Sequence, residues 1–255
     1  MYSNDNQALQ PARDLIIAIP AKERPMKAFK AAVVPAGFST VPPLSRRTEG
    51  ALHDETGALP DVGARFIRCS DAMERMRLGG IDVAIIGRDV VAEFNAKAVR
   101  NGQPVAGVVA ATLPQSACKL TIAVPEESNI TCPQDLAGLR IVTSYPATLA
   151  TWLEENGVDN ATIIEAEGGV ESYVADGLAD VACDVVESGN TLRAHNLRPT
   201  QMVLVDSTAV IVRATRDLGA KNEKLLEALV TRLQKPALRN AAREKRSAGS
   251  MLATV

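Results

Sequence analysis

The chain has 255 residues, of which 46% are hydrophobic and only 3% are aromatic, and its formal net charge at pH 7 is −2. This hydrophobic content provides a core for one large domain or two smaller ones and excludes wholesale disorder. The interspersed charges of both signs exclude the basic surface of a general nucleic-acid-binding protein. Because Ala, Val, Ile and Leu carry the burial, the composition favours helices packed on a parallel sheet.

The cysteines and the N-terminal stretch limit the compartment and the metal chemistry. The four cysteines lie far apart without a C-x-x-C pair, and only two histidines accompany them, so no zinc site is expected. Isolated thiols in apolar runs are typical of a reducing compartment. The first twelve residues lack the features of a signal peptide, and no apolar run reaches the length of a membrane span. We therefore expect a cytoplasmic protein that binds neither membranes nor nucleic acid.

Apolar patterns with turn signals between them predict strands that alternate with helices along most of the chain. The predicted strands are 15–20, 64–69, 81–86, 105–110, 119–125, 139–143, 161–165, a strand starting at 181, 202–206 and 209–213. The predicted helices are 25–34, 70–78, 88–98, 147–156, 170–176, a helix after 191, and 224–235. The segment 39–61 is rich in Pro, Gly and charge and reads as irregular or as a short hairpin. This alternation predicts two α/β halves with largely parallel sheets and a ligand cleft between them.

The stretch V-A-C-D-V-V-E-S-G-N-T-L-R, residues 181–193, carries the clearest chemical signal. An apolar strand is followed by a turn of small residues and by a helix start, an arrangement that presents free backbone N–H groups to an anion such as phosphate. Gly189 leaves room for a ligand to approach the backbone, and Ser188 and Thr191 add hydroxyl donors. Asp184 can accept from sugar hydroxyls or help to hold a divalent cation. The alternative, equally weighted on this stretch alone, is that Ser188 simply caps a helix.

Other stretches add to this one. They are G-I-D-V-A-I-I-G-R-D-V-V-A-E (80–93), K-L-T-I-A-V-P-E (119–126), D-L-A-G-L-R-I-V-T-S-Y-P (135–146), W-L-E-E-N-G-V (152–158), G-G-V-E (168–171), G-L-A-D (177–180) and D-V-V-E-S-G-N-T-L-R-A-H-N-L (184–197). In this order and at this spacing they resemble the catalytic chain of the ATP phosphoribosyltransferase family, over roughly residues 15–213.

The resemblance implies an α/β fold with a two-domain architecture similar to the type II periplasmic binding proteins, with a cleft between the domains. Domain I would comprise residues 14–113 and 206–216, and domain II, residues 114–205, would carry the phosphoribosyl pyrophosphate loop. Residues 1–13 are expected to form a disordered lead-in. Residues 217–255 are expected to form a C-terminal helix and tail without a regulatory domain.

The resemblance also implies the reaction, in which N1 of the ATP adenine displaces pyrophosphate from C1 of phosphoribosyl pyrophosphate with Mg²⁺ as cofactor. This is the first step of histidine biosynthesis. The implied catalytic residues are Asp184, Lys22 and Arg24, and Asp184 is also the implied metal ligand. The implied phosphoribosyl pyrophosphate-binding residues are Asp184, Glu187, Ser188, Gly189, Asn190 and Thr191. The implied ATP-binding residues are Lys22, Arg24, Arg68, Asp89, Ser144, Tyr145 and Glu171.

Most of the implied ATP-binding residues also have a purely structural interpretation. Lys22 and Arg24 are basic residues of the first loop and could equally be solvated charges. Arg68 ends a predicted strand, and the acids Asp89 and Glu171 fall where helix starts favour negative charge. Pro146 makes ordinary N-terminal capping a competing explanation for Ser144 and Tyr145. His195 is expected on the helix surface.

The chain departs from the family pattern at three places, one of which is the segment before Arg65, which matches poorly. The first loop usually reads K-G-R and here reads K-E-R, so Glu23 places a carboxylate where phosphates approach closely. The glycine-containing F-G-x-C-R-L of the family is P-Q-S-A-C-K-L here, in which Lys119 cannot make the bidentate contact of an arginine. These changes leave open an alternative, a weak or inactive paralogue that acts as a small-ligand binding or regulatory module.

The length of the chain bears on its partners. About forty residues follow Arg213, too few for the histidine-binding regulatory domain of the long-form members. The chain therefore resembles the short form, whose members act with a regulatory subunit similar to histidyl-tRNA synthetase. We expect the catalytic core to form a homodimer.

Overall fold

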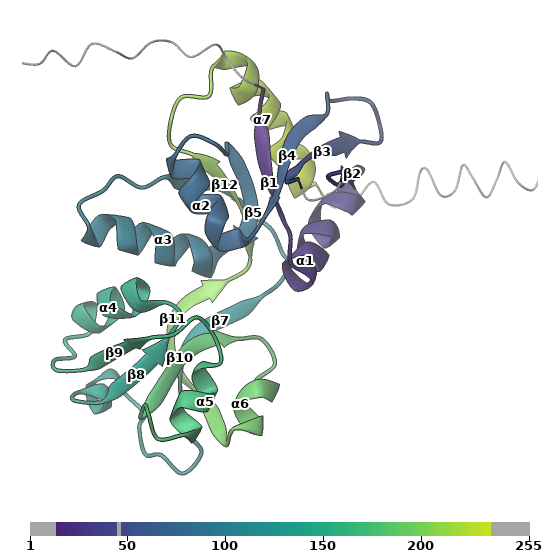
Figure 1. Cartoon of the computed structure of the whole chain (residues 1–255). Helices are drawn as coiled ribbons and strands as arrows, with labels where there is room; N and C mark the ends of the chain where they lie inside the picture. The colour runs from purple at the N-terminus through teal and green to yellow at the C-terminus, as the bar shows by residue number, and fades with distance from the viewer. Residues whose placement is uncertain (1–13, 45–46, 236–255) are drawn as a thin grey trace, which may run out of the picture. The chain divides into compact units, whose positions relative to one another are not determined.

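A computed structural model describes residues 14–44 and 47–235 and contains two β-sheets with helices (Figure 1). The sheets have the strand orders β2-β3-β4-β1-β5-β12-β6 and β11-β7-β10-β8-β9. The strands are β1 (Ile16–Pro20), β2 (Phe38–Val41), β3 (Glu49–Asp54), β4 (Val62–Ile67), β5 (Val83–Gly87), β6 (Gly107–Thr112), β7 (Cys118–Pro125), β8 (Arg140–Thr143), β9 (Thr162–Glu165), β10 (Val181–Val186), β11 (Leu197–Ser207) and β12 (Ala209–Ala214). The helices are α1 (Glu23–Val33), α2 (Cys69–Arg77), α3 (Arg88–Arg100), α4 (Pro146–Glu155), α5 (Val170–Ala175), α6 (Asn190–Ala194) and α7 (Ala220–Gln234).

The α/β class is confirmed, but the prediction of largely parallel sheets was wrong, because both sheets are mixed. β1 runs parallel to β4 and β5, whereas β2, β3 and β4 pair antiparallel. In the other sheet β8 is parallel to β9 and β10, and β7 is antiparallel to β10 and β11. The antiparallel β2–β3 pair confirms the short hairpin, one of the two alternatives predicted for the segment 39–61.

Two elements are longer than the sequence predicted. β11 starts at Leu197 rather than at residue 202, because Leu197 and Arg198 pair with the end of β7 before the register shifts after Pro199. A proline inside a sheet is confined to edges and irregular positions, and β11 is the edge strand of its sheet. α7 starts at Ala220, four residues before the predicted helix.

The described part of the chain forms two compact units, residues 14–84 with 213–235 and residues 85–212. The predicted domain limits, 113 and 206, differ from the limits of these units. They lie close to the ends of the five-stranded sheet, which takes all its strands from residues 118–207. The predicted domains therefore stay a prediction. The lead-in predicted at 1–13 and the tail beyond 235 lie outside the described residues. Within the described residues, no helix combines the length and the apolar character needed to cross a membrane.

The unit formed by residues 85–212 buries side chains on both faces of the five-stranded sheet. Alternation along β10 sends Val181 and Cys183 to one face and Ala182 to the other. α4 covers the first face with Leu149 and Leu153, and α5 and α6 cover the second (Figure 1). Each fully buried aliphatic side chain of this kind contributes about 1.5–3 kcal/mol relative to exposure.

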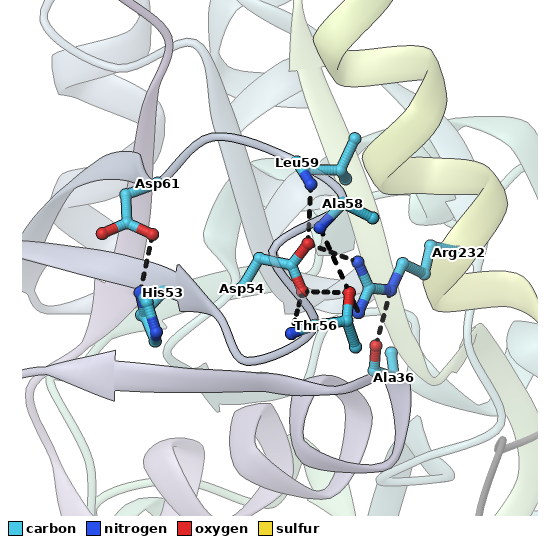
Figure 2. A network of polar contacts seen from close by, with 8 residues as sticks. All are labelled: Ala36, His53, Asp54, Thr56, Ala58, Leu59, Asp61 and Arg232. Atoms are coloured by element: carbon cyan, nitrogen blue, oxygen red, sulfur yellow. Dashed lines mark hydrogen bonds and ion pairs between the residues drawn. The ribbon is translucent and has the colours of Figure 1, made fainter.

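In the other unit, a buried ion pair joins α7 to the turn after β3 (Figure 2). Nη1 of Arg232 donates to Oδ2 of Asp54 at 2.7 Å, and the side chain of Asp54 is fully buried. The same guanidinium donates to the carbonyl of Ala36 at 2.8 Å and to the hydroxyl of Thr56 at 2.9 Å. It also stacks over the ring of Phe38, 4.5 Å from the ring centroid. One side chain of α7 therefore holds two segments of the unit, residues 36–38 and 54–56.

The carboxylate of Asp54 stays ionised in this buried position. Burial opposes ionisation, but the guanidinium of Arg232, the N–H groups of Thr56 and Leu59 and the hydroxyl of Thr56 outweigh it and hold the pKa of Asp54 below its ordinary value. The N–H groups donate at 2.9 Å and 2.7 Å. The charge is thus compensated by a guanidinium and three further hydrogen bonds.

Replacing Arg232 by methionine is expected to lower the free energy of unfolding by about 3 kcal/mol, because it leaves the carboxylate of Asp54 buried without its counter-ion. The matched control is Lys221→Met on the same helix. Lys221 pairs with Asp14 at 2.8 Å, but both side chains are more than 70% exposed, so this loss should be much smaller than that of Arg232. Equal losses for the two variants, measured by urea unfolding, would show that the buried ion pair of Arg232 stabilises the fold no more than an exposed one.

The same network predicts a pH dependence of stability. Because the folded-state pKa of Asp54 is lowered, its stabilising contribution is present above the unfolded-state pKa of about 3.9 and is lost as the pH falls through the folded-state pKa. Asp54→Asn is therefore expected to be less stable than the natural chain at pH 7. The difference should shrink steadily below about pH 4. Thermal melts of both proteins across this range would measure it, and a constant difference would contradict the assignment.

Candidate functional site

Three turns of the five-stranded sheet meet at one edge. β8, β9 and β10 are parallel neighbours, so their carboxyl ends lie on the same side. Ser144 and Tyr145 follow β8, Gly168 and Gly169 follow β9, and residues 187–189 follow β10. The carboxyl ends of parallel strands are the ordinary ligand site of open α/β sheets. The structure therefore gathers the predicted site residues of this unit at one edge.

The antiparallel strand β7 brings further residues to the same edge. Its first residues lie opposite the end of β10, with Lys119 paired to Val186, and opposite the end of β11, with Cys118 paired to Ser207. A cavity of about 430 Å³ opens here. Its lining includes Lys119, Glu187 and Ser207, together with Cys118, Thr121, Val186, Thr200, Gln201, Asp206 and Thr208. This volume lies within the range of small-molecule sites.

Asp184 lies near the end of β10 and is half-buried. It pairs in register with Thr121 of β7, so the two side chains share a face of the sheet. Since side chains alternate along a strand, this is the face of Ala182, the one that α5 and α6 cover. The negative charge of Asp184 acts on the phenol of Tyr145, which follows β8. The carboxylate is thus between the predicted phosphate loop and the neighbouring turn.

The predicted phosphate loop has the expected strand, turn and helix, but the helix is short. α6 spans only five residues, and its N-cap is Gly189 with φ 70°, a left-handed conformation that favours glycine. The interpretation of Ser188 as the N-cap was wrong, although its hydroxyl accepts the N–H of Asn190 at 3.5 Å. Glu187, Ser188, Asn190 and Thr191 are exposed at this loop. A helix of one turn has a small dipole, so the loop depends on its own side chains and N–H groups.

Arg193 folds back over the loop, a placement that the sequence analysis did not assign. Its Nη2 atom donates to the carbonyl of Ser188 at 3.2 Å and to the side-chain oxygen of Asn190. Side chains in helices point towards the N-terminus, so a residue three to four positions into α6 is the one that reaches the turn. That spacing, with a basic residue at it, was the signal available in the sequence.

Asp89, at the first turn of α3, is buried and connects three elements of this unit. Its carboxylate accepts from the hydroxyl of Tyr145 at 2.7 Å and from the hydroxyl of Ser207, whose oxygen in turn accepts the N–H of Asp89 at 3.1 Å. Burial raises the pKa of Tyr145, and the charges of Asp89 and Asp184 raise it further. Tyr145 is therefore a neutral hydrogen-bond donor at physiological pH.

The N-terminus of α4, a second predicted anion or nucleotide site, already holds a carboxylate of the protein. Glu93 of α3 accepts the N–H of Ala147 at 3.0 Å and the N–H of Thr148 at 2.8 Å. The hydroxyl of Ser144 donates to the carbonyl of Ala166 at 2.6 Å. The structure thus supports the capping interpretation of this turn, with an acid that the sequence analysis did not single out.

The remaining predicted residues divide between the two units. Glu171 is half-buried in the first turn of α5, close in sequence to Gly169. Lys22 and Arg68 belong to the other unit, where they follow the parallel neighbours β1 and β4 and cap α1 and α2. Both are exposed at the carboxyl edge of their sheet. The backbone of Arg24 lies in α1, and its side chain is outside the described part.

The structure offers no ready-made metal centre in its described residues, where no three His, Cys, Asp or Glu side chains form a group able to hold an ion. A single carboxylate such as Asp184 matches Mg²⁺ that is carried on substrate phosphates and keeps most of its ligands from them and from water. His195 is the half-buried C-cap residue of α6 rather than a residue of the helix surface, and its Nδ1 is 3.0 Å from the carbonyl of Thr191.

Comparison with known proteins places this site in a family context. Residues 68–235 match the family model described as ATP phosphoribosyltransferase. The chain is 38% identical over 224 residues to the ATP phosphoribosyltransferase of Stenotrophomonas maltophilia (strain R551-3), which covers 88% of this chain and 71% of that protein. It is 35% identical, with the same coverage of both chains, to the ATP phosphoribosyltransferase of Xylella fastidiosa (strain M12).

Solved structures with a similar fold include the ATP phosphoribosyl transferase (HisG:HisZ) complex from Thermotoga maritima, with a TM-score of 0.63 and 20% identity over 86% of this chain and 96% of that chain. The periplasmic aliphatic sulphonate-binding protein SsuA from Escherichia coli has a TM-score of 0.53 and 16% identity, over 93% of this chain and 76% of that chain. The fold expected from the sequence, an α/β fold similar to periplasmic binding proteins, is thus confirmed.

Glu93→Ala is expected to lower the free energy of unfolding by about 1–2 kcal/mol, because two N–H groups of α4 lose their acceptor. The matched control is Glu154→Ala, which also removes a link between α3 and α4. Glu154 pairs with Arg100 at 2.8 Å, but these side chains are 65% and 39% exposed, so its loss should be about 0.5 kcal/mol or less. Chemical denaturation measures both, and equal losses would contradict the capping role of Glu93.

Proposed function

Because the chain belongs to the ATP phosphoribosyltransferase family, we propose that it joins N1 of the ATP adenine to C1 of phosphoribosyl pyrophosphate, with release of pyrophosphate, as the first step of histidine biosynthesis. The observation that carries the proposal is the loop of residues 187–191 at the carboxyl edge of the five-stranded sheet, directly after the acid Asp184. This arrangement suits a sugar phosphate, because donors for the phosphate and an acceptor for the ribose hydroxyls lie side by side.

The donor would bind along this edge. The N–H groups of the loop and the hydroxyls of Ser188 and Thr191 would hold the 5′-phosphate, with Gly189 and Asn190 forming the turn beneath it. Asp184 and Glu187 would accept from the ribose hydroxyls. The lone pair of adenine N1 forms the new bond to C1 as the bond from C1 to the pyrophosphate oxygen breaks. Such a displacement depends on positioning and on charge stabilisation and needs no nucleophile from the protein.

ATP would be held by the residues that the family resemblance implies. Lys22 and Arg68, which are exposed at the carboxyl edge of the seven-stranded sheet, would meet its phosphates together with Arg24. Tyr145 with Asp89 would offer a phenol and a buried carboxylate, and Glu171 and Ser144 complete the proposed set. Ser144 would have to exchange its present bond to Ala166 for one to the ligand. Lys22 and Arg24 are proposed as catalytic together with Asp184, because they would offset the charge of the triphosphate during the reaction.

Mg²⁺ would be held by Asp184 and by the phosphates of the donor, and it would supply the positive charge that stabilises the leaving pyrophosphate. The protein contributes one carboxylate, in keeping with an ion that arrives with its substrate. Lys119, exposed in the cavity beside Glu187, adds a positive charge of the protein to that of the ion at this edge.

The proposal includes two kinds of protein partner. The first is a second copy of the chain, as a homodimeric core. The second is a regulatory subunit similar to histidyl-tRNA synthetase, and the similar Thermotoga maritima structure is described as a HisG:HisZ complex. Both are tested by size-exclusion chromatography with light scattering, on the chain alone and after the addition of a short-form regulatory subunit.

The direct test of the function incubates the chain with ATP, phosphoribosyl pyrophosphate and Mg²⁺ and follows phosphoribosyl-ATP by absorbance and pyrophosphate by a coupled assay. Both products should appear in equal amounts, in the presence or absence of the regulatory subunit. Binding of the donor by calorimetry without product in either condition would contradict the proposal. That result would favour the binding module as the alternative and make Glu23→Gly the first variant to test.

Gly189→Ala is expected to weaken donor binding at least about tenfold. A Cβ at this position would lie 3.3 Å from Nη1 of Arg193, and it would narrow the approach of the phosphate to the backbone. Gly157→Ala is the matched control for strain, since Gly157 has φ 63° in the same unit and no atom within 4 Å of the added Cβ. Each variant should lose about 1 kcal/mol of stability. Equal donor affinities, measured by calorimetry, would exclude Gly189 from the phosphate site.

A further inference from the structure

The guanidinium of Arg193 is anchored at one nitrogen and open at the others. Both of its hydrogen bonds, to Ser188 and to Asn190, come from Nη2. Among the described residues neither Nη1 nor Nε has a hydrogen-bond partner. Nη1 is also the atom nearest to the position of a Cβ on Gly189, at 3.3 Å. The two N–H donors of Nη1 therefore lie beside the bare backbone of the glycine, and the one of Nε is also unused, while Nη2 fixes the plane of the fork.

The charges around the loop favour a guanidinium for binding a phosphate. Asp184 and Glu187 place two carboxylates next to the turn, and Arg193 is the single basic residue in the stretch 181–193. The five-residue helix adds little positive field of its own. The carbonyl oxygen of Ser188 and the side-chain oxygen of Asn190 both accept hydrogen bonds from Arg193. Their negative partial charges are therefore partly offset, and they repel an incoming anion less.

From this geometry we propose that Arg193 is a donor-binding residue, whose guanidinium receives the 5′-phosphate monoester of phosphoribosyl pyrophosphate over Gly189. The inference rests on the proposed function for the identity of the ligand and adds a residue to its phosphate loop. Arginine suits this role, because its planar fork can bind two phosphate oxygens at once while Nη2 stays anchored. Gly189 then has a second purpose, since the missing side chain leaves room for the guanidinium as well as for the ligand.

The test compares Arg193→Gln with the natural chain, with Arg198→Gln as the matched control. Arg198 lies on β11 of the same unit, and its guanidinium also donates to two carbonyls, those of Glu126 and Ser128, at 3.3 Å and 2.7 Å. These carbonyls follow the carboxyl end of β7, at the edge of the sheet opposite to the loop. Circular dichroism and thermal melts confirm that both variants are folded.

Calorimetry with Mg²⁺ then gives the affinities for phosphoribosyl pyrophosphate, ribose 5-phosphate, pyrophosphate and ATP. Arg193→Gln should weaken binding of the two ligands with a 5′-phosphate by about 10- to 100-fold, the effect of a lost charge-assisted contact. The affinities for pyrophosphate and ATP should change by less than about threefold, because neither ligand reaches the loop in this arrangement. Arg198→Gln should leave all four affinities unchanged.

Three results would overturn the inference. They are unchanged affinity of folded Arg193→Gln for both 5′-phosphate ligands, an equal loss towards pyrophosphate and ATP, and failure of the natural chain to bind either 5′-phosphate ligand. The proposed function is tested separately, by the formation of phosphoribosyl-ATP. If the natural chain makes no phosphoribosyl-ATP but its 5′-phosphate affinity still depends on Arg193, the function fails and the inference stands. If product forms and Arg193→Gln binds the donor normally, the inference alone fails.

Discussion

The register of β10 between β8 and β7 is the constraint on which the candidate site depends. Parallel pairing with β8 puts the turns after both strands at one edge, and antiparallel pairing with β7 brings Lys119 and, through β11, Ser207 to the same place. A shift of β10 by one residue would turn Asp184 to the opposite face and move Cys183 from the face covered by α4 to the one covered by α5 and α6. The apolar residues on both faces therefore hold the polar residues of the site in position.

Two strand-to-helix turns at this edge look alike in sequence but differ in the charged side chains that bind to them. At α4 the free N–H groups donate to Glu93, a carboxylate of the protein itself. At α6 the turn keeps its exposed hydroxyls, and Arg193 lies across it with donors to spare. An incoming phosphate therefore meets competition from a built-in anion at the first turn and a cation at the second. The difference directs the phosphate to the loop after β10.

The sequence predicted the α/β class, most elements and the loop around Gly189, because these depend on local patterns of apolar and turn residues. It did not predict the roles of Glu93, Ser207 or Arg193. Glu93 caps residues 54 positions further along the chain, and Ser207 meets an acid 118 positions away, so both depend on tertiary packing that periodicity does not contain. Arg193 acts within a single turn and was within reach of a spacing argument. The β2–β3 hairpin was predicted only as one of two alternatives, because its strands are short and lie in a Pro- and Gly-rich segment.

The ion pair between Asp54 and Arg232 has a consequence for the order of events during synthesis of the chain. Its partners are 178 residues apart, so Asp54 leaves the ribosome long before its guanidinium exists. Until then the carboxylate has only the nearby donors of Thr56 and Leu59 to offset the cost of burial, which delays closure of the turn around it. Residues 85–212 lie wholly within that interval and have all the strands of their sheet available earlier. The unit with the phosphate loop can therefore fold first on the ribosome, and the unit that surrounds it in sequence closes last.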